Sequence, residues 1–217
     1  MREETIKLVE AEKIIAIVRG VGADQCMKVA DALYEGGIRL MEITFDQKNP
    51  ASFQATADAI AAIGKAYEGR MLVGAGTVTT PELVELAASA GAKYIISPDV
   101  NVAVIHRTRE LGLVSMPGAM TPSEVMTAHH AGADFVKLFP VGNLGTAYVK
   151  AIRAPISHVK MLAVGGINEE NVADFLKAGM LGAGVGGNLA NKKWIEAGEF
   201  DKITETARKL LTAVKNA

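Results

Sequence analysis

The strongest constraint on the fold is an alternation of short β-rich runs with helical patterns, repeated along the 217 residues. Eight such runs recur, at 14–19, 40–44, 71–77, 93–98, 113–118, 135–140, 161–166 and 181–187. Between them, segments such as 24–35, 50–66, 81–90 and 122–131 have the apolar spacing and early Pro or Asp of amphipathic helices. This alternation predicts an α/β fold with a parallel sheet. Eight units with short loops favour a closed (β/α)8 TIM barrel, and an open doubly wound sheet is the alternative.

The chain is long enough to bury one sizeable core and short for two. We therefore predict a single barrel domain over residues 1–217. Residues 200–214 supply its last helix, and residues 3–10 an extra N-terminal helix that covers the bottom of the barrel.

Composition and charge exclude several classes of partner. The formal net charge is -1, and no Lys/Arg run could follow a phosphate backbone, so nucleic acid is not an expected partner. The first ten residues are charged, and no stretch of about 18 uncharged apolar residues occurs, so we expect a cytoplasmic protein without membrane contact. The single cysteine, Cys26, lies in a helical pattern and is interpreted as packing rather than as a catalytic thiol.

Lys137 is the residue whose position carries the most chemical information. Active sites of such barrels lie where strands end, and outward positions must be apolar because helices cover them. In the run 135–139, Val136 and Leu138 suit the outer face, which turns Lys137 inward between Phe135 and Phe139. Burial lowers the pKa of an ammonium group and frees the lone pair that attacks a ketone. We predict a Schiff-base lysine, and a structural ion pair is the alternative.

Glu42 is predicted to share the barrel mouth with this lysine. In the run 40–44 the same sorting sends Met41 and Ile43 outward and turns Glu42 and Thr44 inward. Schiff-base chemistry requires proton transfer, for which a partly desolvated carboxylate is suited. Glu42 is the candidate general acid/base, and a role as structural counterion to Lys137 is compatible with it.

Glycine-rich strand ends indicate where a ligand approaches the backbone. Gly74-Ala75-Gly76-Thr77 ends the third run, and the Thr77 hydroxyl can bond a carboxylate or ketone oxygen. A tight turn is the alternative there.

The loops after the seventh and eighth runs contain Gly165-Gly166 and Gly186-Gly187-Asn188, where this fold commonly binds phosphate. Arg19 closes the first run, which neighbours the eighth, so its guanidinium could reach the same anion or form a surface salt bridge. We expect a phosphorylated substrate.

No metal or other cofactor is expected, because the strand ends contain no histidine. The histidines lie in helical or loop stretches, at 106, 129, 130 and 158, and Trp194 is interpreted as packing.

Several ordered motifs resemble those of one enzyme family. They are Glu42-Ile43-Thr44, Gly74-Ala75-Gly76-Thr77, Ile96-Ser97-Pro98, Met116-Pro117-Gly118, Lys137-Leu138-Phe139-Pro140 and Gly165-Gly166, and the likeness extends to the closing segment 197–204. The family is that of the 2-keto-3-deoxy-6-phosphogluconate (KDPG) and 4-hydroxy-2-oxoglutarate (KHG) aldolases.

The resemblance implies that Lys137 forms the Schiff base, Glu42 accepts the proton, Thr77 contacts pyruvate, and Pro98 and Phe139 are pocket walls. It also implies a homotrimer and the reversible cleavage of the phosphorylated keto acid, or its galactonate epimer, to pyruvate and glyceraldehyde 3-phosphate. Gluconate-type members serve the Entner-Doudoroff pathway. Many members also cleave 4-hydroxy-2-oxoglutarate to pyruvate and glyoxylate.

Three positions depart from the family pattern. Asp46 stands where an arginine often helps to hold the carboxylate, Asn188 where a serine often meets the phosphate, and Val164 where a threonine usually precedes the glycine pair. Valine there is similar to members acting on the galactonate epimer. A sugar-phosphate isomerase or decarboxylase on the same barrel is the competing enzyme class, since it would share the phosphate loops without needing Lys137. A phosphate-sensing module is disfavoured, because burying Glu42 and Lys137 without use is costly.

Overall fold

The computed structural model describes residues 2–217, and its strands form one parallel sheet. The described strands are β1 (Ile14–Val18), β2 (Leu40–Thr44), β3 (Leu72–Gly76), β4 (Tyr94–Ile96), β5 (Val114–Met116), β6 (Gly118–Ala119), β7 (Val136–Leu138), β8 (Met161–Val164) and β9 (Gly182–Val185). Their order in the sheet is β5-β4-β3-β2-β1-β9-β8-β7-β6. The first and last strands of the sequence therefore lie side by side.

The sheet closes where β5 and β6 meet. Only Pro117 separates these two strands, and proline has no N–H to donate to a strand ladder. β5 pairs with β4, β6 pairs with β7, and the Pro117 carbonyl accepts a hydrogen bond of 2.9 Å from the Lys137 N–H. The two pieces thus form one interrupted strand, and the prediction of a closed (β/α)8 barrel is confirmed.

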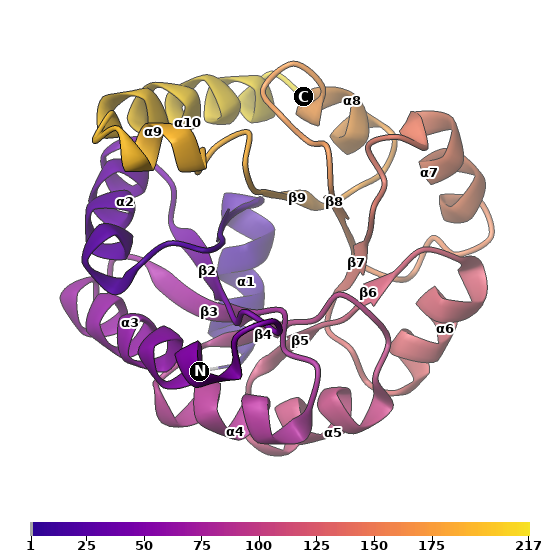
Figure 1. Ribbon diagram of the computed structural model, residues 1–217. Coiled ribbons are helices and arrows are strands. Elements are labelled where there is room, and N and C mark those ends of the chain that lie inside the picture. Colours follow the sequence, from indigo (N-terminus) through magenta and orange to yellow (C-terminus); the bar gives the residue numbers. More distant parts are fainter. Residues whose placement is uncertain (1) are drawn as a thin grey trace.

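Helices form a ring around the strands, whereas α1 (Arg2–Glu12) lies inside the ring (Figure 1). The other helices are α2 (Ala23–Glu35), α3 (Phe53–Ala66), α4 (Pro81–Ser89), α5 (Val102–Glu110), α6 (Pro122–His130), α7 (Gly145–Arg153), α8 (Val172–Lys177), α9 (Lys192–Glu196) and α10 (Phe200–Lys215). The helix expected over 50–66 is divided into a 3-10 turn, η1 (Pro50–Ser52), and α3. At α6, Thr121 and Glu124 form a capping box that satisfies free N–H groups of the first turn.

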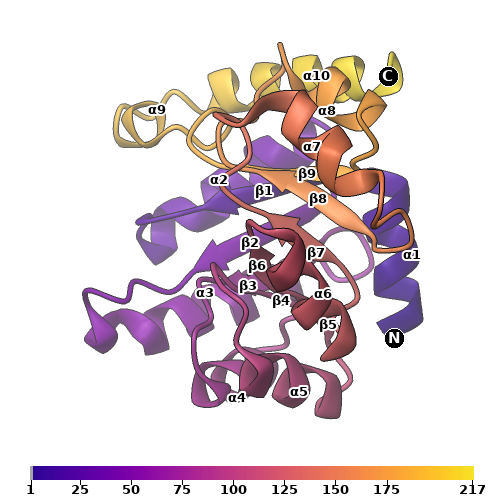
Figure 2. The ribbon, with the colours of Figure 1, turned by 90° about the vertical axis from the view of Figure 1, so that its right-hand side faces the viewer.

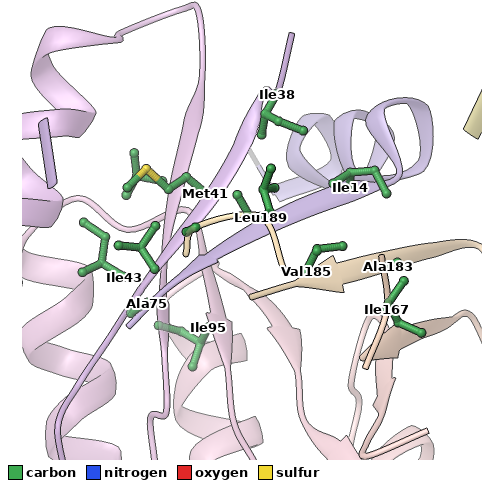
Figure 3. Close-up of a cluster of buried hydrophobic side chains, with 14 of the residues drawn as sticks. Ile14, Ile38, Met41, Ile43, Ala75, Ile95, Ile167, Ala183, Val185 and Leu189 are labelled. Carbon is green, nitrogen blue, oxygen red and sulfur yellow. The ribbon is translucent and has the colours of Figure 1, made fainter. Parts of the chain in front are cut away.

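Alternate residues of the strands face two different cores, as the period of two requires. Met41, Ile43, Ala75 and Ile95 point toward the helices and belong to the larger cluster, part of which is drawn in Figure 3. Inside the barrel lies the smaller cluster, with Ile15, Leu40, Tyr94, Ile96, Val114, Met116, Phe135 and Leu162 among its members. The inner cluster fills the barrel below the level of the strand ends.

Helix α1 covers the end of the barrel at which the strands begin, as predicted (Figure 2). Its Ile6 and Val9 belong to the inner cluster. The side chain of Asp134 holds it there, accepting hydrogen bonds from Arg2 and, at 2.8 Å, from Arg109. Because this end is closed, a ligand must enter at the carboxyl ends of the strands.

Candidate active site

A cleft of about 280 Å³ opens at the carboxyl ends of β1, β7, β8 and β9. Its lining consists of Ile17, Arg19, Lys137, Phe139, Val164, Gly165, Gly166, Ile167, Gly184, Gly186, Gly187 and Asn188. Seven of the ten residues proposed from the sequence as catalytic or binding therefore meet at one opening: Lys137, Arg19, Phe139, Gly165, Gly166, Gly187 and Asn188. Of the other three, Glu42 lies at a deeper level of the barrel.

Lys137 stands in the middle of β7 and points into the barrel. Its neighbours Val136 and Leu138 are buried in the outer cluster, which confirms the predicted sorting of this strand. Only 6% of Lys137 is exposed, and its Nζ lies 4.7 Å from the centre of the Phe139 ring. This placement makes Lys137 the only lysine among residues 2–217 that is buried.

Glu42 comes from the centre of β2 and lies in the same barrel interior. Both side chains line a small internal void of about 10 Å³, together with apolar residues such as Ile96 and Met116. Glu42 is 1% exposed, and its Oε2 atom is buried without a hydrogen-bond partner. A buried carboxylate oxygen without a partner is costly, which makes Glu42 a candidate functional group.

Burial brings the pKa values of Glu42 and Lys137 closer together. Burial raises the pKa of Glu42, whereas the positive charges of Lys137 and Arg19 lower it. Burial lowers the pKa of Lys137, whereas Glu42 raises it and Arg19 lowers it further. Burial thus shifts the two pKa values in opposite directions and reduces the difference between them. Proton transfer from Lys137 to Glu42 therefore costs less than it would in water.

Thr77 follows β3 on the other side of the mouth. It is outside the lining of the cleft, but it adjoins Gly76, whose α-carbon lies against the Glu42 carboxylate. Its backbone has φ +56°, a left-handed conformation that a β-branched residue rarely adopts. Its hydroxyl forms no hydrogen bond with another described residue.

The glycine loops present free backbone N–H groups along the cleft. Gly165 and Gly166 both have positive φ, at +90° and +78°. Within the described residues, the N–H groups of Gly166, Ile167, Gly187 and Asn188 donate to no protein acceptor. Neither glycine pair leads directly into a helix, because α8 begins at Val172 and α9 at Lys192. The candidate anion site is therefore formed by the loops themselves rather than by a helix N-terminus.

Asn188 and Arg19 have different positions at this site. The Asn188 Nδ2 donates to the Ile167 carbonyl at 2.9 Å, which ties the two glycine loops together. Arg19 is exposed at the rim and forms no salt bridge with a described residue. The alternative role considered for it, a surface salt bridge, is therefore absent from the described residues.

Two sequence candidates lie away from the cleft. Pro98 is exposed after β4, and its carbonyl packs against Gly118. Asp46 lines a separate hollow between β1, β2 and α3, where its Oδ1 accepts the Lys48 N–H at 3.0 Å. The position at which an arginine often holds the carboxylate thus contributes nothing to the cleft.

The other residues singled out in the sequence, Cys26, Trp194 and the histidines, lie outside the lining of the cleft. Cys26 is fully buried, and burial raises the pKa of its thiol to about 11, which agrees with packing. Trp194 packs against the outer cluster from α9. His129 lies near His130 and His158, with ring centres 5.8 and 5.1 Å away, at the end of α6 remote from the mouth.

Across residues 2–217 no group of three His, Cys, Asp or Glu side chains is placed to hold a metal ion. None of the described helices has the length and apolar character needed to cross a membrane.

Sequence reasoning missed three residues that support the site: Gly76, Gln47 and Ser97. Gly76 leaves room for the Glu42 carboxylate. Gln47 donates to the Thr77 carbonyl at 2.9 Å, and the buried Ser97 hydroxyl donates to the Val78 carbonyl at 2.7 Å. Gly76 and Ser97 belong to motifs that the chain shares with the aldolase family, so the sequence offered a signal for both. Nothing in the sequence distinguishes Gln47 from other polar loop residues.

Comparison with known proteins points to one enzyme family. The family model described as "KDPG and KHG aldolase" matches residues 5–206. The 2-dehydro-3-deoxy-6-phosphogalactonate aldolase of Escherichia coli (strain K12) is 37% identical over 177 residues, 81% of this chain and 83% of its own length. The 2-dehydro-3-deoxy-phosphogluconate aldolase of Haemophilus influenzae is 29% identical over 98% of both chains.

A solved structure of a KDPG aldolase is also similar to this chain over most of its length. The KDPG aldolase of Legionella pneumophila, with pyruvate captured at low pH as a covalent carbinolamine intermediate, superimposes with a TM-score of 0.84. It is 25% identical, and the match covers 94% of this chain and 97% of the other. The chain therefore belongs to the KDPG and KHG aldolase family.

Proposed function

We propose that this chain is a class I aldolase, a lyase in which Lys137 forms a Schiff base with a 2-keto acid and Glu42 carries the protons. The observation that carries the proposal is the burial of Lys137 and Glu42 around one void directly beneath the cleft. The KDPG aldolase of Legionella pneumophila, in which pyruvate was captured as a covalent carbinolamine intermediate, supports the same chemistry. A sugar-phosphate isomerase or decarboxylase would have no use for the buried amine.

The proposed reaction uses each group in turn. Neutral Lys137 Nζ forms a bond to C2 of the keto acid, and the keto oxygen takes up the proton that the nitrogen loses, which gives a carbinolamine. Protonated Glu42 gives its proton to the new hydroxyl, which leaves as water, and a protonated imine remains. The protonated imine accepts the electron pair of the C3–C4 bond while the Glu42 carboxylate takes the proton of the C4 hydroxyl, and the aldehyde departs. Glu42 returns that proton to C3 of the enamine, and water then hydrolyses the protonated imine to release pyruvate and the free lysine, with the surplus proton returning to Glu42.

The distal half of the substrate is proposed to end in a phosphate. Four free N–H groups in the glycine loops, together with the Arg19 guanidinium at the rim, form an electropositive cradle that suits a phosphate group. We propose 2-keto-3-deoxy-6-phosphogluconate or its galactonate epimer as substrate, with 4-hydroxy-2-oxoglutarate as a further one. Thr77 is proposed to bond the carboxylate of the pyruvate half, with Pro98 and Phe139 as walls.

We further propose a single cytoplasmic domain that assembles as a homotrimer and, with the gluconate epimer, serves the Entner-Doudoroff pathway. Met120 and Leu144, exposed by 41% and 38%, follow β6 and β7 and would be covered in such an assembly. Sedimentation equilibrium measures the number of subunits.

Borohydride trapping tests the catalytic proposal. Pyruvate with borohydride should add one reduced pyruvate to the protein, and peptide mapping should place it on Lys137. Lys137→Ala should abolish the label. Lys160→Ala is the matched control, because Lys160 also lies near a phenylalanine ring, at 5.7 Å from the centre of Phe135, but is partly exposed and pairs with Glu10. Labelling that persists without Lys137 contradicts the proposal.

A panel of 2-keto-3-deoxy acids, with and without phosphate, identifies the substrate by pyruvate release. Turnover should continue in the presence of a chelator. Activity lost with a chelator and restored by a divalent ion would overturn the class I assignment.

A further inference from the structure

We propose that Gln47 is a positioning residue, which holds Thr77 in the orientation that binds the carboxylate of the pyruvate half. The inference rests on the proposed function, in which Thr77 contacts that carboxylate. Gln47 itself touches no part of the cleft lined by Lys137.

The starting observation is the backbone of Thr77. Two residues other than glycine have positive φ in the described chain, Lys13 and Thr77. Lys13 follows the last residue of α1, where left-handed backbone often ends a helix. Thr77 ends no helix, and its branched Cβ makes this conformation unfavourable. Unfavourable backbone persists only where the surroundings fix it, and it gathers at functional sites.

The residues on either side of Thr77 are fixed by their own hydrogen bonds. The Gly76 carbonyl accepts the Phe45 N–H at 3.0 Å, and the Val78 N–H donates to the Ile96 carbonyl at 3.2 Å. The Ser97 hydroxyl donates to the Val78 carbonyl at 2.7 Å in a buried position. These contacts anchor the flanking peptides but leave the Thr77 carbonyl itself to be satisfied.

Gln47 satisfies it from the neighbouring loop. Its Nε2 donates to the Thr77 carbonyl at 2.9 Å, and its Oε1 accepts the Thr79 hydroxyl at 3.2 Å. The second bond fixes the orientation of the amide, so the donor faces Thr77. Gln47, although exposed, thus joins the loop after β2 to the loop after β3 and restrains the backbone that carries the Thr77 hydroxyl.

This chain depends on Thr77 more than a site with an arginine would. Asp46 faces a separate hollow and turns its carboxylate to the Lys48 N–H, so it offers no positive charge to the substrate. On this side of the mouth the Thr77 hydroxyl forms no hydrogen bond with another described residue, and Thr77 directly follows Gly76, against which the Glu42 carboxylate lies. Misdirecting it should weaken binding of the keto acid without altering the chemistry at Lys137.

The test measures exchange of the pyruvate methyl protons with deuterated water by NMR, as a function of pyruvate concentration. Gln47→Ala should raise the KM for pyruvate by about tenfold, the scale of one hydrogen bond to a charged group. The kcat of exchange and the maximal borohydride label on Lys137 should stay within about twofold of the parent values. Gln54→Ala is the matched control, since Gln54 bonds Asp58 on α3 and should leave both constants unchanged.

A double-mutant cycle separates positioning from general destabilisation. In a Thr77→Ala background, where the hydroxyl is already absent, Gln47→Ala should change KM by less than about twofold. An unchanged KM in Gln47→Ala alone, or an equal loss with and without the Thr77 hydroxyl, overturns the inference. If the parent protein neither exchanges pyruvate protons nor accepts the borohydride label, the proposed function fails instead.

Discussion

The carboxylate of Glu42 lies against the α-carbon of Gly76, so that a methyl group added there would stand 2.7 Å from Oε1. Gly76 has no left-handed backbone, so conformational freedom does not explain the glycine. The requirement is space for the carboxylate. A glycine at the end of β3 therefore helps to define where Glu42 can reach a bound keto acid.

Gly76→Ala should displace the Glu42 carboxylate and slow proton exchange at the methyl of bound pyruvate by about tenfold or more, because an acid/base must lie within hydrogen-bond reach of the proton that it moves. Borohydride labelling of Lys137 should persist. Gly64→Ala is the matched control, since a methyl group there meets nothing within 4 Å and lies in helix α3. Equal exchange rates in Gly76→Ala and the parent would show that the Glu42 carboxylate does not need the space left by Gly76.

Glu42→Gln tests the carboxylate directly. The amide keeps the size of the side chain but cannot exchange a proton, so methyl exchange in bound pyruvate should fall by roughly 10²-fold or more. Imine trapping at Lys137 should still reach one label per chain, although more slowly, because Glu42 also supplies the proton for the loss of water. If exchange stays near the parent rate, the proton carrier lies elsewhere and Glu42 is a structural counterion.

Lys137→Met should stabilise the protein while abolishing the label. A buried ammonium without a direct ion pair disfavours folding, and a methionine of similar length removes that cost. Burial lowers the pKa of Lys137, so the folded protein binds this proton less tightly than the unfolded chain. The penalty is therefore fully present below the folded pKa and fades as pH rises toward the unfolded value.

Urea unfolding at several pH values measures this effect. The gain in Lys137→Met over the parent should shrink between neutral pH and about pH 10, near the ordinary pKa of lysine. Lys160→Met, at a partly exposed lysine paired with Glu10, is the control and should show no gain. A destabilised Lys137→Met would indicate that the lysine has a structural role.

The barrel and its inward groups could be predicted because both follow from periodicity. The period of two along β2 and β7 assigned Glu42 and Lys137 to the interior, and the outward neighbours are buried under the helices as expected. The split at Pro117 was not foreseen, because a single proline can end a strand or merely interrupt it.

The loops could not be predicted to the same depth. The sequence placed Asp46 four residues after Glu42, but which hollow it faces depends on an Asx-type bond to Lys48 that residue spacing does not specify. The positive φ of Thr77 runs against the preference of threonine, so no local rule indicates it. The Thr77 carbonyl accepts its hydrogen bond from Gln47, which is 30 residues away in sequence.

The last prediction concerns the stereochemistry of the substrate. Val164 ends β8 immediately before the glycine pair and lines the cleft, between Lys137 and the glycine loops that the proposed substrate would span. A methyl-lined wall cannot hydrogen-bond that hydroxyl, so only shape distinguishes the two epimers, which is worth about 1–3 kcal/mol. We expect both the gluconate and galactonate epimers to be cleaved, with kcat/KM values within roughly 10²-fold of each other.

Val164→Thr should shift this ratio toward the gluconate epimer, because threonine has nearly the shape of valine and adds a hydrogen-bonding hydroxyl. Val185→Thr is the control: Val185 lies in the outer cluster, so a hydroxyl there should leave the ratio unchanged even if stability falls. Kinetics of both epimers with the three proteins provide the measurement. A ratio of kcat/KM above about 10⁴ in favour of the gluconate epimer, measured on the parent protein, exceeds what shape alone gives. It would show that another residue hydrogen-bonds the C4 hydroxyl.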